Sequence, residues 1–263
     1  MTGDGHLRLE WLDAVPVRRS RRSFDGRAFS ADLGAGLLSM TREFRPFPDS
    51  RAVFVDVAPQ SLFAGILGSY GGVSGAPSAM LFVGDTASPY AAEHVGYMGE
   101  ALVLDATLLG LATCWIGGLF SGGVAERLAT LAPGERVFAV SPVGHALVSV
   151  SGKERVLFGA GREKKRLSLE DIAPGYHSWP PWAQRAIETV RPAPSAMHAQ
   201  PWRFRMADDA LIVAYHGAER VRVSKRLDVG IAMLHAELGA LSEGAHGVWT
   251  PLASPDVARF EVD

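Results

Sequence analysis

The residues of this chain with the clearest capacity for chemistry are the arginines of the segment RRSRRSF, from Arg18 to Phe24. A phosphate group carries a charge of roughly −1.5 to −2 at neutral pH, and the planar guanidinium group matches its oxygens with paired hydrogen bonds. Arg18, Arg19 and Arg22, together with the hydroxyl of Ser20, could therefore bind a phosphate. The alternative is an ordinary basic surface, because clustered charges usually lie in water.

A second candidate is the segment CWIGGLF, from Cys114 to Phe120, where a predicted helix leads into two adjacent glycines. Gly117 and Gly118 allow the backbone to approach a flat ligand closely and to point an N–H group at it. The alternative is that they only end the helix, as glycine commonly does. We interpret Cys114 as a small packed residue and not as a nucleophile.

The third candidate is the segment RPAPSAMHAQPWRF, residues 191–204, which holds three prolines and a run of small residues. Prolines remove backbone donors and interrupt helices and strands, so the segment is predicted to form a rigid loop. His198 and Gln200 offer polar side chains, and Trp202 is expected to anchor the loop in the core. Such a loop suits a planar heterocycle with polar edges, although it could also be purely structural.

The pattern of apolar residues predicts the elements that must position these candidates. Short apolar runs bounded by Pro, Gly and Asp indicate strands, and a longer run that is apolar on nearly all faces indicates a central buried helix. In the earlier part of the chain we predict strands within 50–59 and 76–85, a helix over 96–112, and a strand over 136–141 that turns at Pro142. In the later part, beyond a polar basic segment, we predict a helix from Trp182, a strand over 210–215 and a helix over 227–241.

The two predicted central helices share a spacing of glycine and tryptophan. Three residues of the first helix region each have an identical residue 134 positions later: Gly96 and Gly230, Gly110 and Gly244, Trp115 and Trp249. This constant offset predicts a degenerate internal duplication. Two such helices packed side by side would form, within one chain, the pseudo-twofold core that a homodimer forms from two.

Composition limits the class of protein. The chain has 263 residues, 48% of them hydrophobic, and 26 Lys+Arg balance 28 Asp+Glu, which favours neither nucleic acid nor an anionic membrane surface as a partner. The first residues lack the features of an export signal, and Asp105 interrupts the longest apolar stretch, so we expect a cytoplasmic protein without a membrane span. A single cysteine and eight histidines without ligand spacing predict no metal site.

Familiar catalytic signatures are missing from the sequence. The segment FGAG, which begins at Phe158, lacks the third glycine of a dinucleotide-binding fingerprint. The sequence likewise contains no phosphate-binding loop of the Walker type, no GxSxG and no HExxH.

Together, RRSRRSF, GYMGEALVLDATLLGLATCWIGG, REKKRLSLEDI and APSAMHAQPWRF resemble the flavin-dependent nitroreductase family over most of the chain. In ordinary members the Gln-Pro-Trp loop comes shortly after the arginine-rich start, whereas here it follows the basic segment. The chain is thus similar to a smaller group of relatives in which one chain imitates the family's homodimer. The resemblance implies an α+β nitroreductase-like fold with paired central helices, antiparallel sheets and two pseudo-symmetric halves, residues 1–174 and 175–263.

The resemblance also implies the residues that contact FMN. Arg18, Arg19 and Ser20 would hold the phosphate, Arg166 and Lys164 would add positive charge, and Arg22 would lie towards the pyrimidine edge. The turn Ile116, Gly117 and Gly118 would lie near the flavin N5, while the second half would lend a loop formed by Pro194, Ser195, Ala196, His198 and Gln200. His198 stands where the family commonly has Asn, and VGHA (143–146) replaces a more usual Gly-Tyr-Pro turn.

The implied activity is an FMN-dependent oxidoreductase that takes hydride from NADH or NADPH and reduces a nitroaromatic, quinone or similar small acceptor by a ping-pong mechanism. We expect a monomer with one FMN per chain, and the sequence indicates no side chain as the catalytic acid. Two alternatives stay open. One is an FMN protein of the same fold with another reaction, such as reductive dehalogenation or flavin breakdown. The other is a flavin-free binding or scaffold protein that kept the fold.

Overall fold

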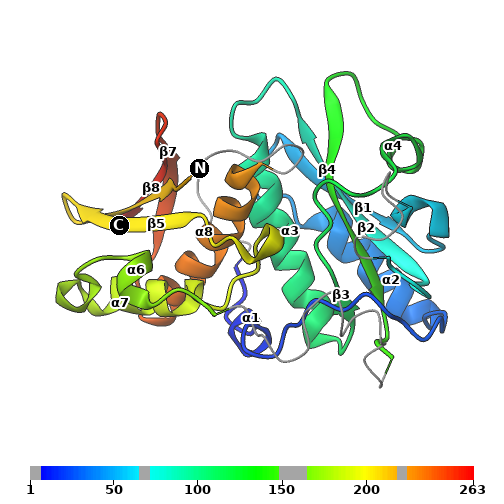
Figure 1. The fold of residues 1–263 in the computed structure, drawn as a ribbon, viewed down its shortest axis with the longest axis horizontal. Coiled ribbons are helices and arrows are strands. Elements are labelled where there is room, and N and C mark those ends of the chain that lie inside the picture. The colour runs from blue at the N-terminus through cyan, green and yellow to red at the C-terminus, as the bar shows by residue number, and fades with distance from the viewer. Residues whose placement is uncertain (1–6, 65–71, 148–164, 218–223) are drawn as a thin grey trace.

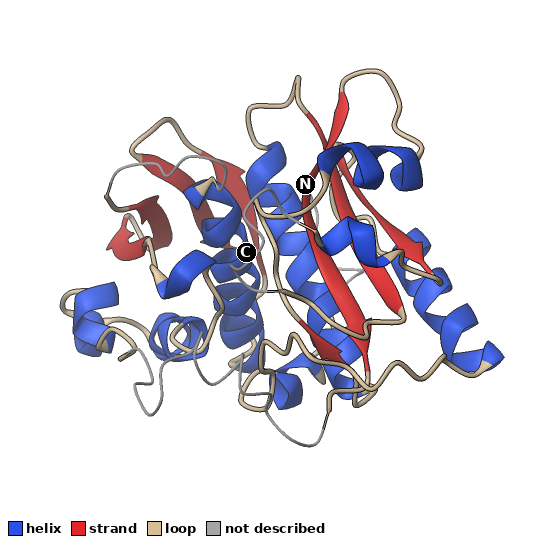
Figure 2. Cartoon of the chain, turned by 45° about the vertical axis from the view of Figure 1, so that its right-hand side comes forward, coloured by secondary structure: helices blue, strands red, loops and turns tan. Residues whose placement is uncertain are grey.

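Two four-stranded antiparallel sheets lie on opposite sides of a pair of central helices (Figure 1). The computed structural model describes residues 7–64, 72–147, 165–217 and 224–263. Figure 2 shows the helices between the two sheets and along their outer sides. This arrangement confirms the expected α+β class with antiparallel sheets and paired central helices.

The first sheet contains strands β1 (Ser50–Val55), β2 (Ser78–Asp85), β3 (Ala112–Thr113) and β4 (Glu135–Gly144), in the order β1-β2-β4-β3. Strand β2 is buried along nearly its whole length, as its continuous apolar sequence predicts. The expected turn at Pro142 was wrong, because β4 continues to Gly144 and pairs Pro142 with Ala79. The fixed φ of proline suits an extended strand, and only its N–H donor is missing.

The second sheet contains β5 (Trp202–Ala207), β6 (Ala210–Tyr215), β7 (Gly247–Pro251) and β8 (Asp256–Val262), in the order β5-β6-β8-β7. Taken in sequence order within each sheet, the strands are arranged identically in both: first, second, fourth, third. Each sheet also has one register shift between its second and fourth strands. The two sheets therefore share a topology.

The central helices are α3 (Ala91–Leu108) and α8 (Lys225–Ser242), which have 18 residues each and are buried along most of their length. Helix α3 begins five residues earlier than the predicted 96–112 and ends at Leu108, before Gly110, which has a φ of 73°. A glycine in the left-handed region commonly ends a helix, which explains the earlier stop. The side chain of Ser224 caps α8 by accepting a hydrogen bond from the Arg226 N–H.

The two helices touch through a reciprocal pair of glycines. A Cβ atom on Gly96 would lie 2.1 Å from the carbonyl oxygen of Leu227, and one on Gly230 would lie 2.0 Å from that of Glu93. Gly230 and Leu227 lie 134 positions after Gly96 and Glu93, so the same contact is made once in each direction. Only glycine permits this approach, and the reciprocity is what a twofold arrangement of helices requires. The internal duplication itself stays a prediction.

The remaining helices cover the sheets and the central pair. Helix α7 packs along α8, and α2 packs on β1. The sequence did not predict α2, in which only Leu37 and Thr41 are buried, so its apolar periodicity is weak. These helices are α1 (Trp11–Ala14), α2 (Ala31–Glu43), α4 (Gly122–Ala129), α6 (Leu169–Ile172) and α7 (Pro181–Val190), with single 3-10 turns at η1 (Gln60–Phe63), η2 (Tyr176–Ser178) and η3 (Ala196–His198). Within the described ranges, none of the helices has the length and apolar character to cross a membrane.

Candidate functional site

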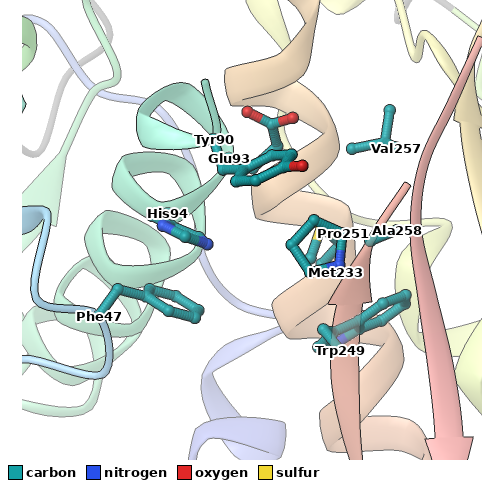
Figure 3. A pocket seen from close by; sticks show the side chains of 9 residues that line it. All are labelled: Phe47, Tyr90, Glu93, His94, Met233, Trp249, Pro251, Val257 and Ala258. Atoms are coloured by element: carbon teal, nitrogen blue, oxygen red, sulfur yellow. The ribbon is translucent and has the colours of Figure 1, made fainter. Parts of the chain in front are cut away.

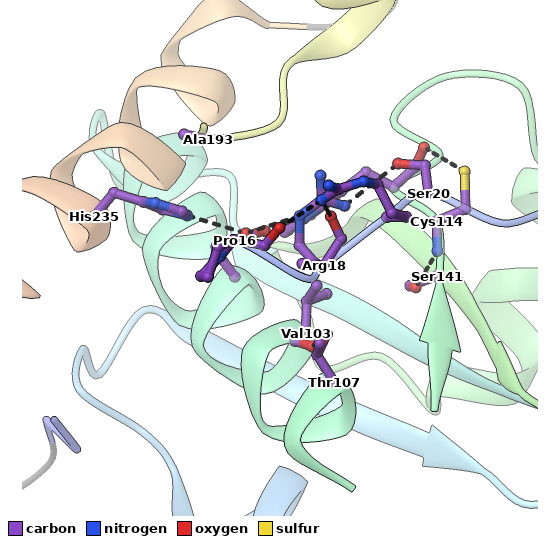
Figure 4. A network of polar contacts seen from close by, with 12 residues as sticks. Pro16, Arg18, Ser20, Val103, Thr107, Cys114, Ser141, Ala193 and His235 are labelled. Atoms are coloured by element: carbon purple, nitrogen blue, oxygen red, sulfur yellow. Dashed lines mark hydrogen bonds and ion pairs between the residues drawn. The ribbon is translucent and has the colours of Figure 1, made fainter. Parts of the chain in front are cut away.

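The arginine-rich segment leads from α1 to the side of α3, where one arginine becomes buried. Arg18 is only 7% exposed, and its Nε lies 3.8 Å from a carboxylate oxygen of Glu100 on α3. At the other end of the guanidinium group, Nη1 lies 3.4 Å from the hydroxyl of Ser20. Figure 4 shows Arg18 between His235 of α8 and Ser20. Arg18 is therefore not part of a solvated basic surface.

Glu100 is the centre of a buried polar cluster that joins the two halves of the molecule. It is fully buried, and its second carboxylate oxygen accepts a 2.7 Å hydrogen bond from the indole N–H of Trp115. Its first oxygen lies 3.1 Å from Nε2 of His235, which is 1% exposed. Nδ1 of His235 lies 3.0 Å from the carbonyl oxygen of Thr189 on α7. The cluster thus connects α3, α7 and α8.

The hydrogen-bond partners of His235 fix the charge of this cluster. The Thr189 carbonyl can only accept, so Nδ1 must carry a proton. A further proton must lie between Nε2 and the Glu100 carboxylate, because two acceptors cannot bond each other. Whichever of the two carries that proton, the charges of Arg18, Glu100 and His235 add up to +1. Buried charge is normally paired, so this geometry favours a bound anion beside Arg18.

The other arginines of the segment lie nearer the surface. Arg19 is exposed, and its Nη1 donates to the carbonyl oxygens of Pro16 and Arg18 at 2.8 and 2.9 Å. Arg22 is half-buried, and its carbonyl oxygen accepts from the Ser74 N–H at 2.9 Å. Of the three arginines expected at a phosphate, Arg18 is thus the one held most firmly by the fold.

The glycine turn lies next to the arginine-rich segment. Ser20 forms a parallel bridge with Thr113, and the Arg21 N–H donates to the Thr113 carbonyl at 2.9 Å. Both backbone groups of Ile116 bond to Val140, at 2.9 and 3.0 Å. The half-buried Gly117 and Gly118 follow directly, in a bend. The structure therefore brings together the first two candidate segments, while the Ile116 backbone is already engaged in the sheet.

The proline-rich loop is anchored to the first turn of α8. The N–H of Ala196 lies 3.0 and 3.2 Å from the two carboxylate oxygens of Asp228, which is 3% exposed. The Ser195 hydroxyl accepts from the Gln200 N–H at 2.9 Å, and Oε1 of Gln200 accepts from the Leu167 N–H at 3.0 Å. Gln200 therefore holds the loop to the preceding segment.

The same loop has a strained backbone. Met197, His198 and Gln200 have φ values of 53°, 58° and 48°, in the left-handed region that side chains other than glycine rarely adopt. Each such residue costs on the order of 1 kcal/mol or more, and such residues concentrate at functional sites. The strain persists because Asp228 holds the loop at one end and buried Trp202 holds it at the other.

Arg166 connects the basic segment to this loop. Its Nη1 donates to the carbonyl oxygens of Arg191 and Ala193, both at 2.8 Å. Pro194, which follows, is buried. The loop anchor Asp228 precedes His235 by seven residues on α8, which is roughly 10 Å along the helix. The loop and the charged cluster thus share one helix, and Lys164 lies outside the described residues.

Sequence reasoning missed Glu100, His235 and Asp228 as members of the candidate site. Glu100 could have been noticed in the sequence, because it is one of two acidic residues, with Asp105, within the mostly apolar GEALVLDATLL of a predicted buried helix. Buried carboxylates need a partner, but the partners are remote in sequence, and His235 is 135 residues away. The pairing became visible only in the fold.

A small cavity lies where the central helices α3 and α8 meet strands β7 and β8. Figure 3 shows Phe47 and His94 facing Met233 and Trp249 across it. The Phe47 ring stacks on His94 with ring centres 3.9 Å apart, and Nδ1 of His94 lies 2.7 Å from a carboxylate oxygen of Asp49. Burial alone would raise the pKa of Asp49, but hydrogen bonds from His94 and Ser88 outweigh it and hold that pKa below its ordinary value.

The sequence matches one model of a known protein family. The model described as "Putative TM nitroreductase" matches residues 10–240. The chain belongs to this nitroreductase family. No curated protein matches the sequence.

A solved structure of a putative nitroreductase resembles this nitroreductase family member in fold over nearly the whole chain. A putative nitroreductase from Thermotoga maritima MSB8 aligns over 99% of this chain and 96% of that chain, with a TM-score of 0.61 and 18% identity. A nitroreductase with bound FMN from Bacteroides fragilis covers 54% of this chain and 91% of its own, with a TM-score of 0.43 and 17% identity. A putative NADH oxidase from Clostridium acetobutylicum covers 57% and 99%, with a TM-score of 0.42 and 16% identity.

Proposed function

We propose that this chain is an FMN-dependent oxidoreductase that takes hydride from NADH or NADPH and reduces a nitroaromatic, quinone or similar small acceptor by a ping-pong mechanism. The observation that carries the proposal is the buried cluster of Arg18, Glu100 and His235, with its net charge of +1. A flavin phosphate supplies the anion that this cluster needs, and a scaffold that had lost its flavin would have no reason to keep such a charge buried.

The residues present fit FMN in their chemistry. Arg18 and the Ser20 hydroxyl offer donors to the phosphate, with the exposed Arg19 beside them. The glycine turn and the strained loop provide backbone groups and the side chains of Ser195 and His198 for the ring and ribityl chain. When bound, FMN supplies the hydride-accepting and hydride-donating chemistry, and the protein supplies position, electrostatics and exclusion of water.

We also propose that the chain acts as a cytoplasmic monomer that arose by internal duplication. The reciprocal glycine contact of α3 and α8, the shared strand order of the two sheets and the equal length of the helices support the duplication. Because these helices already bury one another, a second copy is not needed to complete the core. The single cysteine fits a reducing compartment.

The test is a reconstitution followed by absorption spectroscopy. Apoprotein is incubated with FMN, freed of unbound flavin and treated anaerobically with NADH or NADPH, and a nitroaromatic or quinone is then added. We expect the flavin band to bleach with the reduced nicotinamide and to return with the acceptor. A bound flavin that neither nucleotide bleaches would contradict the reductase and support another flavin reaction. Failure to bind FMN would support a flavin-free binding protein of the same fold.

A further inference from the structure

We propose that Glu100 is a positioning residue for the flavin phosphate, acting through Arg18. This inference rests on the proposed function. Arg18 approaches Glu100 with Nε and Ser20 with Nη1. The carboxylate therefore faces the Nε side of the guanidinium group. The Nη1 side, next to Ser20, is the side that we assign to the anion. Arg18 and Glu100 are both more than nine-tenths buried, so neither can exchange its partner for water.

Arg18 and Glu100 form an ion pair while the shared proton lies on His235, and Glu100→Gln removes that ion pair. Among the described residues, Glu100 is the carboxylate within ion-pair distance of Arg18. A buried guanidinium without a counter-charge is strongly unfavourable, so the side chain would be displaced from its present position. Arg18 would then no longer hold its Nη1 group beside Ser20, where it could contact the phosphate.

Glu100 also holds the start of the glycine turn. Its second oxygen accepts the hydrogen bond from Trp115, which is followed directly by Ile116, Gly117 and Gly118. One carboxylate therefore fixes the two elements that the first half contributes to the proposed site. It also ties them to His235 on α8, the helix that anchors the proline-rich loop.

The equivalent position in the second half lacks this arrangement. Trp249 is the counterpart of Trp115, but the counterpart of Glu100, 134 residues later, is Leu234. The indole N–H of Trp249 is accordingly buried without a hydrogen-bond partner. Trp249 lines a small cavity in which the Phe47 ring is stacked on His94 (Figure 3). Of these two paired positions, only the one at Glu100 therefore carries a carboxyl group.

The experiment compares FMN with riboflavin, which has the same ring system and no phosphate. Dissociation constants of both are measured by flavin fluorescence for the wild type and for Glu100→Gln. We expect Glu100→Gln to weaken FMN binding by about tenfold or more, the scale of one charge-assisted hydrogen bond, with little change for riboflavin. An equal loss for both ligands, or no loss for either, would overturn the proposal, because a merely structural role does not distinguish the phosphate.

A matched control is Glu237→Gln. Glu237 is also buried on a central helix and accepts a 2.8 Å hydrogen bond from the Tyr97 hydroxyl, but it belongs to α8 and is not a partner of Arg18. The same change there should leave the preference for FMN over riboflavin unaltered. A loss of that preference in Glu237→Gln would show that any buried glutamate has this effect, and would overturn the specific role of Glu100.

A double variant keeps the test decisive if Glu100→Gln does not fold. Arg18→Gln/Glu100→Gln removes both charges of the pair, so folding of the double variant alone would support the pairing. Failure of both to fold would assign Glu100 to the core and overturn its role through Arg18. A wild-type protein that binds neither flavin would defeat the proposed function, whereas a wild type that prefers FMN together with an unchanged Glu100→Gln defeats only this inference.

Discussion

At the scale of single residues, burial separates Arg18 from the other arginines of its segment. Arg19 bonds only to nearby backbone carbonyls and is exposed, whereas Arg18 joins a cluster that reaches the opposite half of the molecule. A charged group in such a place has a large effect on any anion beside it, since the surroundings screen it weakly.

The variant Arg18→Gln tests the phosphate contact. We expect FMN affinity to fall by about tenfold or more, because a charge-assisted hydrogen bond is worth roughly 1.5–3 kcal/mol. Equilibrium dialysis measures the loss. Arg205→Gln is the control, since Arg205 pairs with Asp256 on the surface and should not affect the flavin. Full FMN affinity in Arg18→Gln would place the phosphate elsewhere.

Asp49 carries a prediction about pH. Its pKa in the folded protein lies below the ordinary value of 3.8. The ionised carboxylate therefore stabilises the native state above about pH 3.8, and this stabilisation is lost as the pH falls through the lowered pKa. We expect Asp49→Asn to lower the free energy of unfolding by about 1 kcal/mol at neutral pH and by progressively less below about pH 4. Urea unfolding at several pH values measures this difference.

The control for Asp49 is Asp208→Asn. The side chain of Asp208 is 87% exposed, and its nearest cation, on Arg259, lies 3.9 Å away. An exposed ion pair of this kind contributes little to stability. The unfolding curve of Asp208→Asn should therefore coincide with that of the wild type at every pH. A constant difference between Asp49→Asn and wild type down to pH 2.5 would contradict the assigned cause.

At the scale of elements, the close approach of α3 and α8 makes a sharp prediction. In Gly96→Ala the new methyl group would meet the Leu227 carbonyl, so the helices must separate, and we expect a loss of about 3 kcal/mol or more of unfolding free energy. Gly36→Ala is the matched control, because Gly36 lies within α2 with nothing within 4 Å of its added Cβ. That change should stabilise the protein by about 0.5–1 kcal/mol.

Thermal unfolding of the two variants decides the matter. A Gly96→Ala variant as stable as the wild type would contradict the reciprocal helix contact. Equal destabilisation by both substitutions would show that the effect is not specific to the crossing of α3 and α8.

The elements that the sequence predicted are those with strong local patterns. Strands β2 and β6 and helices α3, α7 and α8 have apolar runs whose length and periodicity define them. Helix α2 and the strand continuation at Pro142 were not predicted, because the first buries few residues and the second depends on pairing with β2. Likewise, the site segments were visible as motifs, whereas the Arg18, Glu100 and His235 cluster depends on contacts between distant parts of the chain.

At the scale of the whole molecule, near-symmetry in the backbone coexists with asymmetry in the side chains. The sheets share their strand order and the central helices their length, yet Glu100 faces Trp115 in one half and Leu234 takes the equivalent position in the other. A duplicated chain can keep the fold in both halves while only one place retains the charges that bind a ligand. Our proposal of one flavin for each chain follows from this difference.

The most direct measurement is a calorimetric titration of the wild-type apoprotein with FMN and, in parallel, with riboflavin. Our account predicts saturation at one FMN per chain and an affinity for riboflavin lower by about tenfold or more, since only FMN brings the anion that the buried cluster lacks. Equal affinity for the two flavins, two equivalents of FMN per chain, or no binding of either would contradict it.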